Sequence, residues 1–252
     1  MSSWYDYKPY VPVHERQANA KCKIAKLLGN DAQPIEKFGG RKLAKTFWGE
    51  AWCENLEAYS DYANRLPRGR TYSKNGSVAH LEINEGKVLA YISGSELYKV
   101  QVSIDALDNE RWEAFKSRCS GRIDTLLDLL QGKVADAVLL EITNRQDGLF
   151  PAPKEIDFTC SCPDSAIMCK HVAATLYGVG IRLDSEPELF FALRGVDHAE
   201  IIASASTDSL DEGLPEHEDL LLEGDLAGIF GIEFSDIPTR LIKKMRAVKV
   251  KR

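Results

Sequence analysis

The chain has 252 residues, of which 44% are hydrophobic and 28% are charged, as in an ordinary globular protein with enough apolar side chains for a core. It has no apolar run approaching the ~20 residues of a membrane span, and its polar, aromatic N-terminus lacks the apolar core of a signal peptide. The net charge of −6 does not indicate a general affinity for nucleic acid. We therefore expect a cytoplasmic protein, or a nuclear one in a nucleated cell, with no membrane partner and no small-molecule substrate.

The N-terminal part shows two patterns. Residues 1–45 have little apolar periodicity and include Gly39-Gly40 beside a basic run, so we expect an extended arm. A helix is expected next, because large apolar side chains then recur at helical spacing. These side chains, which we expect to anchor a core, are Trp48, Trp52, Leu56 and Tyr59.

The stretch RLPRGRTYSKNG, residues 65–76, is expected to be a loop, because Pro67, Gly69 and the pair Asn75-Gly76 favour turns. Its basic side chains surround an aromatic one, an arrangement that can follow a phosphate backbone and stack a base. A solvated loop without a partner is the simpler interpretation. The residues that could contact nucleic acid here are Arg65, Arg68, Arg70, Tyr72 and Lys74.

Three segments with a period of two come next, at residues 77–83, 87–93 and 98–104, and turn residues separate them. They predict an antiparallel meander with one buried and one solvated face. Helices are expected after Asp108, a plausible N-cap, and then within residues 122–132 and 134–144. The sequence therefore predicts an α+β fold, a meander with flanking helices.

Four potential metal ligands then fall within twelve residues of FTCSCPDSAIMCKHVAATLYG, with the spacing C-x-C-x6-C-x-H. Residues two apart on a strand point to the same side, so Cys160 and Cys162 can face one ion. Residues two apart inside a helix diverge by about 200°. Cys169 should therefore lie at or before the N-cap of the following helix, with His171 in its first turn.

This arrangement predicts two short strands, a turn and a helix folded around one Zn²⁺, which prefers four nitrogen or sulfur ligands. We expect the helix N-terminus to favour the negative site and to lower the thiol pKa values. A redox Cys pair would leave His171 unexplained, and a few buried thiols would leave the clustering unexplained. The other cysteines, Cys22, Cys53 and Cys119, are expected to be small buried apolar residues. We also expect Cys169→Ser to unfold this region alone and to leave the meander standing.

The pattern C-x-C…C-x-H followed by a small apolar helix, here CKHVAATLYG, resembles the SWIM zinc finger. The segments FWGEAWCENLE, RGRTYSKNGSV, VLAYISGSELYKV, ELFFALRG and DLAGIFGI resemble bacterial SWIM proteins often encoded beside Swi/Snf-type helicases. The resemblance covers roughly residues 38–232, and it departs at Ser165, where many relatives carry an aromatic residue. It implies zinc at Cys160, Cys162, Cys169 and His171, no catalytic residues, and a DNA- or protein-binding role as an accessory to such a helicase.

The C-terminal part changes sharply in charge. Residues 205–239 contain ten acidic residues and no Lys or Arg, whereas residues 240–252 contain seven Lys or Arg and no acid. The basic tail offers Lys243, Lys244 and Arg246 as further nucleic-acid contacts. The acidic linker favours the alternative of a protein-only adaptor, because its carboxylates repel DNA and could mask the tail.

An enzyme is not expected. His198-Ala199-Glu200 superficially resembles the H-x-E of nucleobase deaminases, but there a P-C-x-x-C pair follows, and here the cysteines come earlier. No P-loop motif is present in the sequence. Pro151 and Pro153 mark a domain boundary before the cysteine cluster. The expected division is an arm at 1–45, an α+β domain at 46–145, the SWIM finger with its following helices at 146–204, an acidic linker at 205–239 and a basic tail at 240–252.

Overall fold

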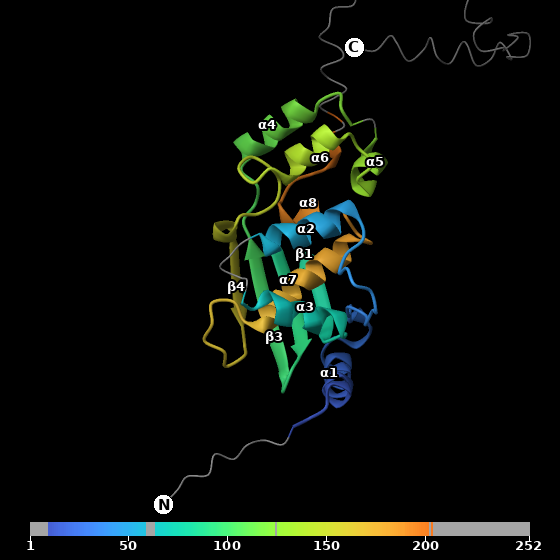
Figure 1. The fold of residues 1–252 in the computed structure, drawn as a ribbon, viewed down its shortest axis with the longest axis vertical. Coiled ribbons are helices and arrows are strands. Elements are labelled where there is room, and N and C mark those ends of the chain that lie inside the picture. Colours follow the sequence, from blue (N-terminus) through green and yellow to red (C-terminus); the bar gives the residue numbers. More distant parts are fainter. Residues whose placement is uncertain (1–9, 59–63, 124, 202, 204–252) are drawn as a thin grey trace, which may run out of the picture. The chain divides into compact units, whose positions relative to one another are not determined.

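The computed structural model describes residues 10–58, 64–123, 125–201 and 203, which belong to one compact unit (Figure 1). It has the α+β architecture that the sequence predicts, with one antiparallel sheet and flanking helices. Among the described helices, none combines the length and the apolar character that crossing a membrane requires.

The sheet has four strands in the order β1-β2-β3-β4, and each neighbouring pair is antiparallel. The first three form the predicted meander. β4, from the cysteine cluster, pairs with β3, so that Cys160 lies opposite Val100. The strand bounds are Val78–Asn84 for β1, Lys87–Ser93 for β2, Leu97–Ile104 for β3 and Ile156–Cys160 for β4.

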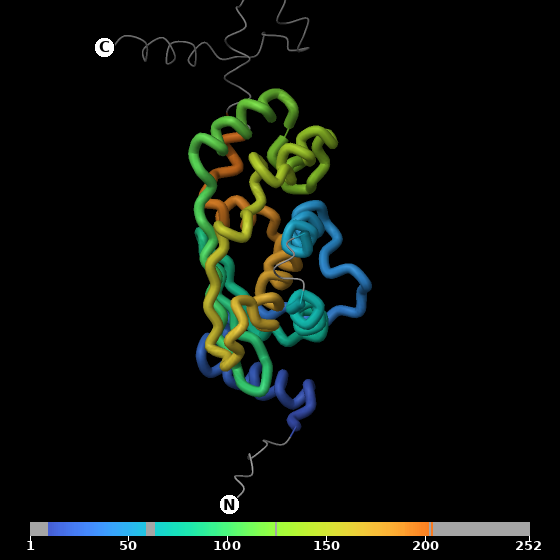
Figure 2. Tube along the Cα trace, turned by 60° about the vertical axis from the view of Figure 1, so that its left-hand side comes forward, coloured from blue at the N-terminus to red at the C-terminus, as the bar shows by residue number. Residues whose placement is uncertain are grey.

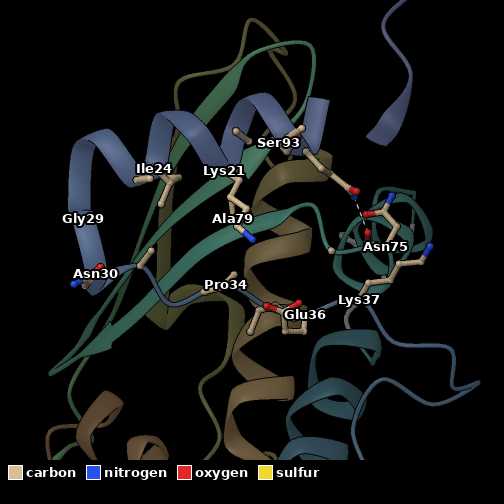
Figure 3. Close-up of a pocket in the computed structure, with 17 residues that line it drawn as sticks. Lys21, Ile24, Gly29, Asn30, Pro34, Glu36, Lys37, Asn75, Ala79 and Ser93 are labelled. Carbon is tan, nitrogen blue, oxygen red and sulfur yellow. Dashed lines mark hydrogen bonds between the residues drawn. The ribbon is translucent and has the colours of Figure 1, made fainter. Parts of the chain in front are cut away.

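Helices cover the sheet unequally. On one face α7 packs directly against all four strands, and α2 and α3 pack on the outer side of α7 (Figure 2). On the other face α1 packs against β1 and β2 (Figure 3). The helix bounds are Val13–Leu28 for α1, Phe47–Glu57 for α2, Leu66–Lys74 for α3, Asn109–Cys119 for α4, Leu126–Gln131 for α5, Asp136–Thr143 for α6, Lys170–Leu183 for α7 and Leu189–Leu193 for α8, with short 3₁₀ turns at Gly29–Asp31 and Pro153–Glu155.

The core lies between α7, α2 and the sheet. Trp48 and Trp52 are buried there, as predicted, and their indole N–H groups donate to the carbonyl oxygens of Leu129 and Leu176. These bonds satisfy the polar atoms that burial would otherwise leave unpaired. The predicted N-cap of α4 is also confirmed, because the Asp108 carboxylate accepts hydrogen bonds from two amides in the first turn.

Two elements differ from expectation. α1 occupies part of the expected extended arm. α3 replaces the expected loop: Pro67 lies in its first turn, where a missing N–H costs nothing, and Gly69 lies where α3 meets α7. A Cβ at Gly69 would fall 2.4 Å from the Cβ of Ala173, so this glycine permits close helix packing. The same residues that favour turns in isolation therefore serve a helix contact here.

The expected boundary at residue 146 does not separate two units among the described residues. β4 completes the meander sheet, and α7 is the helix that α2 and α3 cover. The metal-binding segment therefore lies within the main core. The expected linker at 205–239 and the expected tail at 240–252 lie outside the described residues.

Candidate metal centre

Three elements bring the four predicted ligands together. Cys160 is the last residue of β4, and Cys162 lies in the bend that follows it. Cys169 is the N-cap of α7, and His171 lies in the first turn, as the spacing predicts. The Cys169 sulfur accepts a hydrogen bond from the Val172 amide at 3.5 Å, which fixes the sulfur at the helix N-terminus. The segment supplies one strand, β4, and not the two that were expected; its partner in the sheet is β3 of the meander.

The ligand atoms of Cys160, Cys162, Cys169 and His171 all lie within 4.8 Å of one another. The His171 Nδ1 atom lies 3.8 Å from the sulfurs of both Cys160 and Cys169, so Nδ1 is the ring nitrogen directed at the cluster. Three thiols and one imidazole are a donor set that Zn²⁺ favours. With all four positions supplied by the protein, such a site leaves none for water or substrate, which is typical of a structural zinc.

Burial controls the protonation of these ligands. It raises the pKa of the Cys160 and Cys169 thiols, and for Cys169 the amide of Val172 opposes that shift without overcoming it. The amides at the helix N-terminus therefore act to lower the pKa of the Cys169 thiol, as expected, but burial outweighs them. Burial and the neighbouring Lys170 ammonium lower the pKa of His171 to about 4, so the imidazole is neutral and ready to bind a metal. A bound zinc would supply the positive charge that favours the thiolates, with release of their protons.

Aromatic rings and a glycine enclose His171. The Tyr98 ring stacks on the imidazole at 4.4 Å between centroids, and Tyr72 of α3 meets it edge-on at 5.7 Å. A Cβ at Gly94 would lie 2.6 Å from the Tyr98 ring and 3.2 Å from Nε2 of His171. Sequence reasoning did not identify Tyr98 or Gly94 as part of the site. The only available signal was a glycine in the turn between the second and third strands.

The basic residues of α3 are largely occupied. Arg70 pairs with Glu57 at 2.9 Å, and Arg65 pairs with Asp164 of the cysteine segment at 3.5 Å. Lys74 donates to two backbone carbonyl oxygens of the 40–41 segment. The Lys170 ammonium lies 5.3 Å from the Tyr72 ring centroid. Arg68, in contrast, is exposed and forms no ion pair with a described residue. The other predicted nucleic-acid contacts, Lys243, Lys244 and Arg246, lie outside the described residues.

The remaining cysteines and the H-x-E segment lie outside the ligand cluster. Cys53 and Cys119 are buried as expected, but Cys22 is exposed on α1. Glu200 accepts hydrogen bonds from the Trp112 indole and the Lys116 ammonium, and His198 packs against Phe191. These contacts give Glu200 and His198 structural partners.

Fold and ligand geometry together define a structural zinc module whose metal segment forms part of the core. The family model for the SWIM zinc finger matches residues 153–178, so the chain contains a SWIM zinc finger, as the sequence resemblance predicted. The chain is also 30% identical over 176 residues to the uncharacterized protein Rv2102 of Mycobacterium tuberculosis. That match covers 69% of this chain and 63% of the relative, so this chain accounts for less than two thirds of the relative's length. No solved structure matches the chain.

Proposed function

We propose that this chain is a non-catalytic accessory factor in the cytoplasm, in which the structural zinc fixes a surface for binding DNA, protein or both. We further propose that its protein partner is a Swi/Snf-type helicase. The observation that supports this role is that the protein supplies a complete set of four ligands. They converge where β4 meets α7, so a bound zinc would have no coordination position left for substrate.

The surface next to the zinc ligands joins α3 to the bend before α7. The Asp164 carboxylate accepts a hydrogen bond from the Ala166 amide and pairs with Arg65, the N-cap residue of α3. On the other side of the bend, Lys170 lies over the Tyr72 ring. Zinc would hold this bend in place through Cys162 and Cys169, so the surface would depend on the metal. Arg68 and Lys170 are the cations there that could contact phosphate.

A protein-only adaptor remains the second candidate, because one specific feature favours it. Ile167, in the bend between Cys162 and Cys169, is 90% exposed. A large apolar side chain presented on a metal-fixed bend is suited to a pocket on a partner protein. The ion pairs of Arg65 and Arg70 also reduce the positive charge that DNA would meet.

The test combines metal content with binding. Plasma mass spectrometry on the full chain should find a single zinc per molecule, and a salt titration should show binding of single- or double-stranded DNA that weakens with salt. Arg68→Gln should weaken DNA binding, whereas Ile167→Ser should weaken capture of the purified helicase. A single zinc without DNA binding at low salt would favour the adaptor. Absence of metal from protein purified in zinc-supplemented medium would overturn the proposal.

A further inference from the structure

α1 carries an unbalanced set of cations. Its sixteen residues contain one acid, Glu15, whose carboxylate lies 3.9 Å from the His14 ring. Within the described part of the chain, none of its cations forms an ion pair, and no acid lies three or four positions from its lysines on the helix. This is unusual for a chain with a net charge of −6, because surface helices commonly pair such cations with acids one turn away. The unpaired cations are Arg16, Lys21, Lys23 and Lys26.

A hollow of about 490 Å³ lies beneath this helix (Figure 3). It is bounded by α1, by the segment at residues 29–37, and by the ends of α3, β1 and β2. Part of its wall is apolar and consists of the side chains of Ile24, Ile35 and Ala79. Lys21 extends into the hollow from α1, as Figure 3 shows. The hollow is therefore apolar on part of its surface and has a cation at its edge.

The charged residues that line the hollow are two lysines and one acid. Lys21 and Lys37 line it and form no ion pair with a described residue, and Glu36 is its only lining acid. Ser93 is 4% exposed as a residue, and its buried hydroxyl oxygen has no hydrogen-bond partner among the described residues. The Gln17 amide is already engaged, because it donates to the Asn75 carbonyl oxygen at 2.6 Å. Two ammonium groups without an ion pair fit a ligand that carries negative charge.

Cations lie on both flanks of α1. Lys21 lines the hollow already described, whereas Arg16 and Lys23 line a smaller one of about 270 Å³ between α1 and the turn after β2. A single small anion would need only one of these flanks. A polyanion with regularly spaced charges can contact cations on both, and it can place one unstacked base in the larger hollow.

We propose that α1 is the phosphate-contacting element of a single-stranded nucleic acid site, and that the hollow between α1 and the sheet receives one unstacked nucleotide. Lys21 and Lys37 contact the flanking phosphates, and Ser93 is one of the residues that line the pocket that takes the base. This deepens the proposed function and rests on it, since it adds a nucleic-acid contact at α1 to the one proposed at Arg68 and Lys170.

The test measures fluorescence anisotropy of a labelled twelve-nucleotide DNA strand and of the matching duplex with the full chain at several salt concentrations. The double variant Lys21→Gln/Lys37→Gln should weaken binding of the single strand about tenfold and reduce the log–log salt slope by about 1.4, because each lost single-strand phosphate contact is worth about 0.7. The control variant Lys133→Gln/Lys154→Gln removes the same charge at exposed positions that do not line the hollow. It should change binding less than twofold.

A second variant narrows the hollow without changing the net charge of the protein. Ala18 and Ala25 line it from α1 and are exposed, so Ala18→Leu/Ala25→Leu should preserve the helix. It should weaken binding of the single strand and leave duplex binding unchanged. Circular dichroism and zinc content check that each variant folds.

The outcomes separate this inference from the proposed function. Single-strand binding that is equally weakened by the test and control pairs, or that is unaffected by both α1 variants, overturns the role of α1 and leaves the DNA-binding function standing. Absence of binding to either DNA at low salt overturns both.

Discussion

At the scale of single residues, Arg194 shows how the fold accommodates a buried charge. Its side chain is 1% exposed, and its guanidinium donates to the Asp105 carbonyl oxygen at 2.7 Å and to the Glu155 carboxylate at 3.5 Å. Arg111 also donates to the Glu155 carboxylate, at 3.0 Å. Glu155 thus holds one negative charge between two cations at the start of β4, and without it the buried Arg194 would lack a counter-charge.

We expect Glu155→Gln to lower the free energy of unfolding at pH 7 by about 2 to 4 kcal/mol, because removing one partner leaves a buried charge uncompensated. Burial alone would raise the pKa of Glu155, but the Ala152 amide and the Arg194 and Arg111 guanidinium groups outweigh burial and lower it. A carboxyl whose pKa is lower in the folded protein adds stability above its unfolded pKa and loses it as the pH falls through its folded pKa. Urea unfolding measured from pH 7 to pH 3 should therefore show that the free energies of unfolding of the variant and of the wild type converge as the pH falls.

The matched control is Glu186→Gln, which removes the partner of Arg182 four positions further on, just after α7, where the Glu186 side chain is 44% exposed. That change should cost less than about 0.5 kcal/mol. Equal effects of the two substitutions would contradict the role of Glu155. The Arg194–Glu155 pair could not have been predicted from the sequence, because 39 positions separate the partners. The zinc ligands could be predicted because their spacing is local and restricts which atoms can meet.

At the scale of elements, the packing of α3 on α7 depends on Gly69. We expect Gly69→Ala to destabilise the protein by about 1 to 3 kcal/mol, because the added methyl would overlap the backbone as well as the side chain of Ala173. Backbone atoms in the middle of a buried helix have little room to move. Urea unfolding curves with an unchanged slope and a lower midpoint would show this loss.

Gly39→Ala is the control, since a Cβ there would meet no atom within 4 Å and the residue does not have positive φ. That variant should be neutral or slightly stabilising, because alanine restricts the unfolded chain more than glycine does. A Gly69→Ala protein as stable as wild type would show that α3 and α7 can separate without cost. The sequence predicted a loop at α3 because Pro67 and Gly69 are as common in turns as they are suited to this helix. Only the contact of α3 with α7 shows that the segment is a helix.

At the scale of the whole molecule, the strands, most helices and the metal ligands follow from periodicity and spacing, whereas the relation between segments does not. The spacing of Cys160 and Cys162 indicated a strand but not which strand it pairs with. The apolar run of α7 indicated a buried helix but not that α2 and α3 cover it. Both pairings are long-range contacts, and they are the reason that the expected separate finger is part of the core.

This placement changes what loss of zinc should do. Cys169 caps α7, and α7 lies against the sheet, α2 and α3, so Cys169→Ser should destabilise the whole described unit and not the metal segment alone. A ligand bound at a thousand times its dissociation constant contributes about 4 kcal/mol, and its loss should lower the melting temperature by roughly 8 to 16 °C for a domain of this size.

Far-ultraviolet circular dichroism and the fluorescence of the buried Trp48 and Trp52 should report coincident single transitions, in the variant and in wild type treated with a chelator. Cys22→Ser removes an exposed thiol outside the cluster, so it should keep the wild-type zinc content and melting temperature. Two separate transitions, with the tryptophan signal unchanged by loss of zinc, would instead mean that the metal segment folds independently of the sheet. The pairing of β4 with β3 predicts the single transition, because the strand that carries Cys160 cannot leave without exposing the neighbouring strand of the meander.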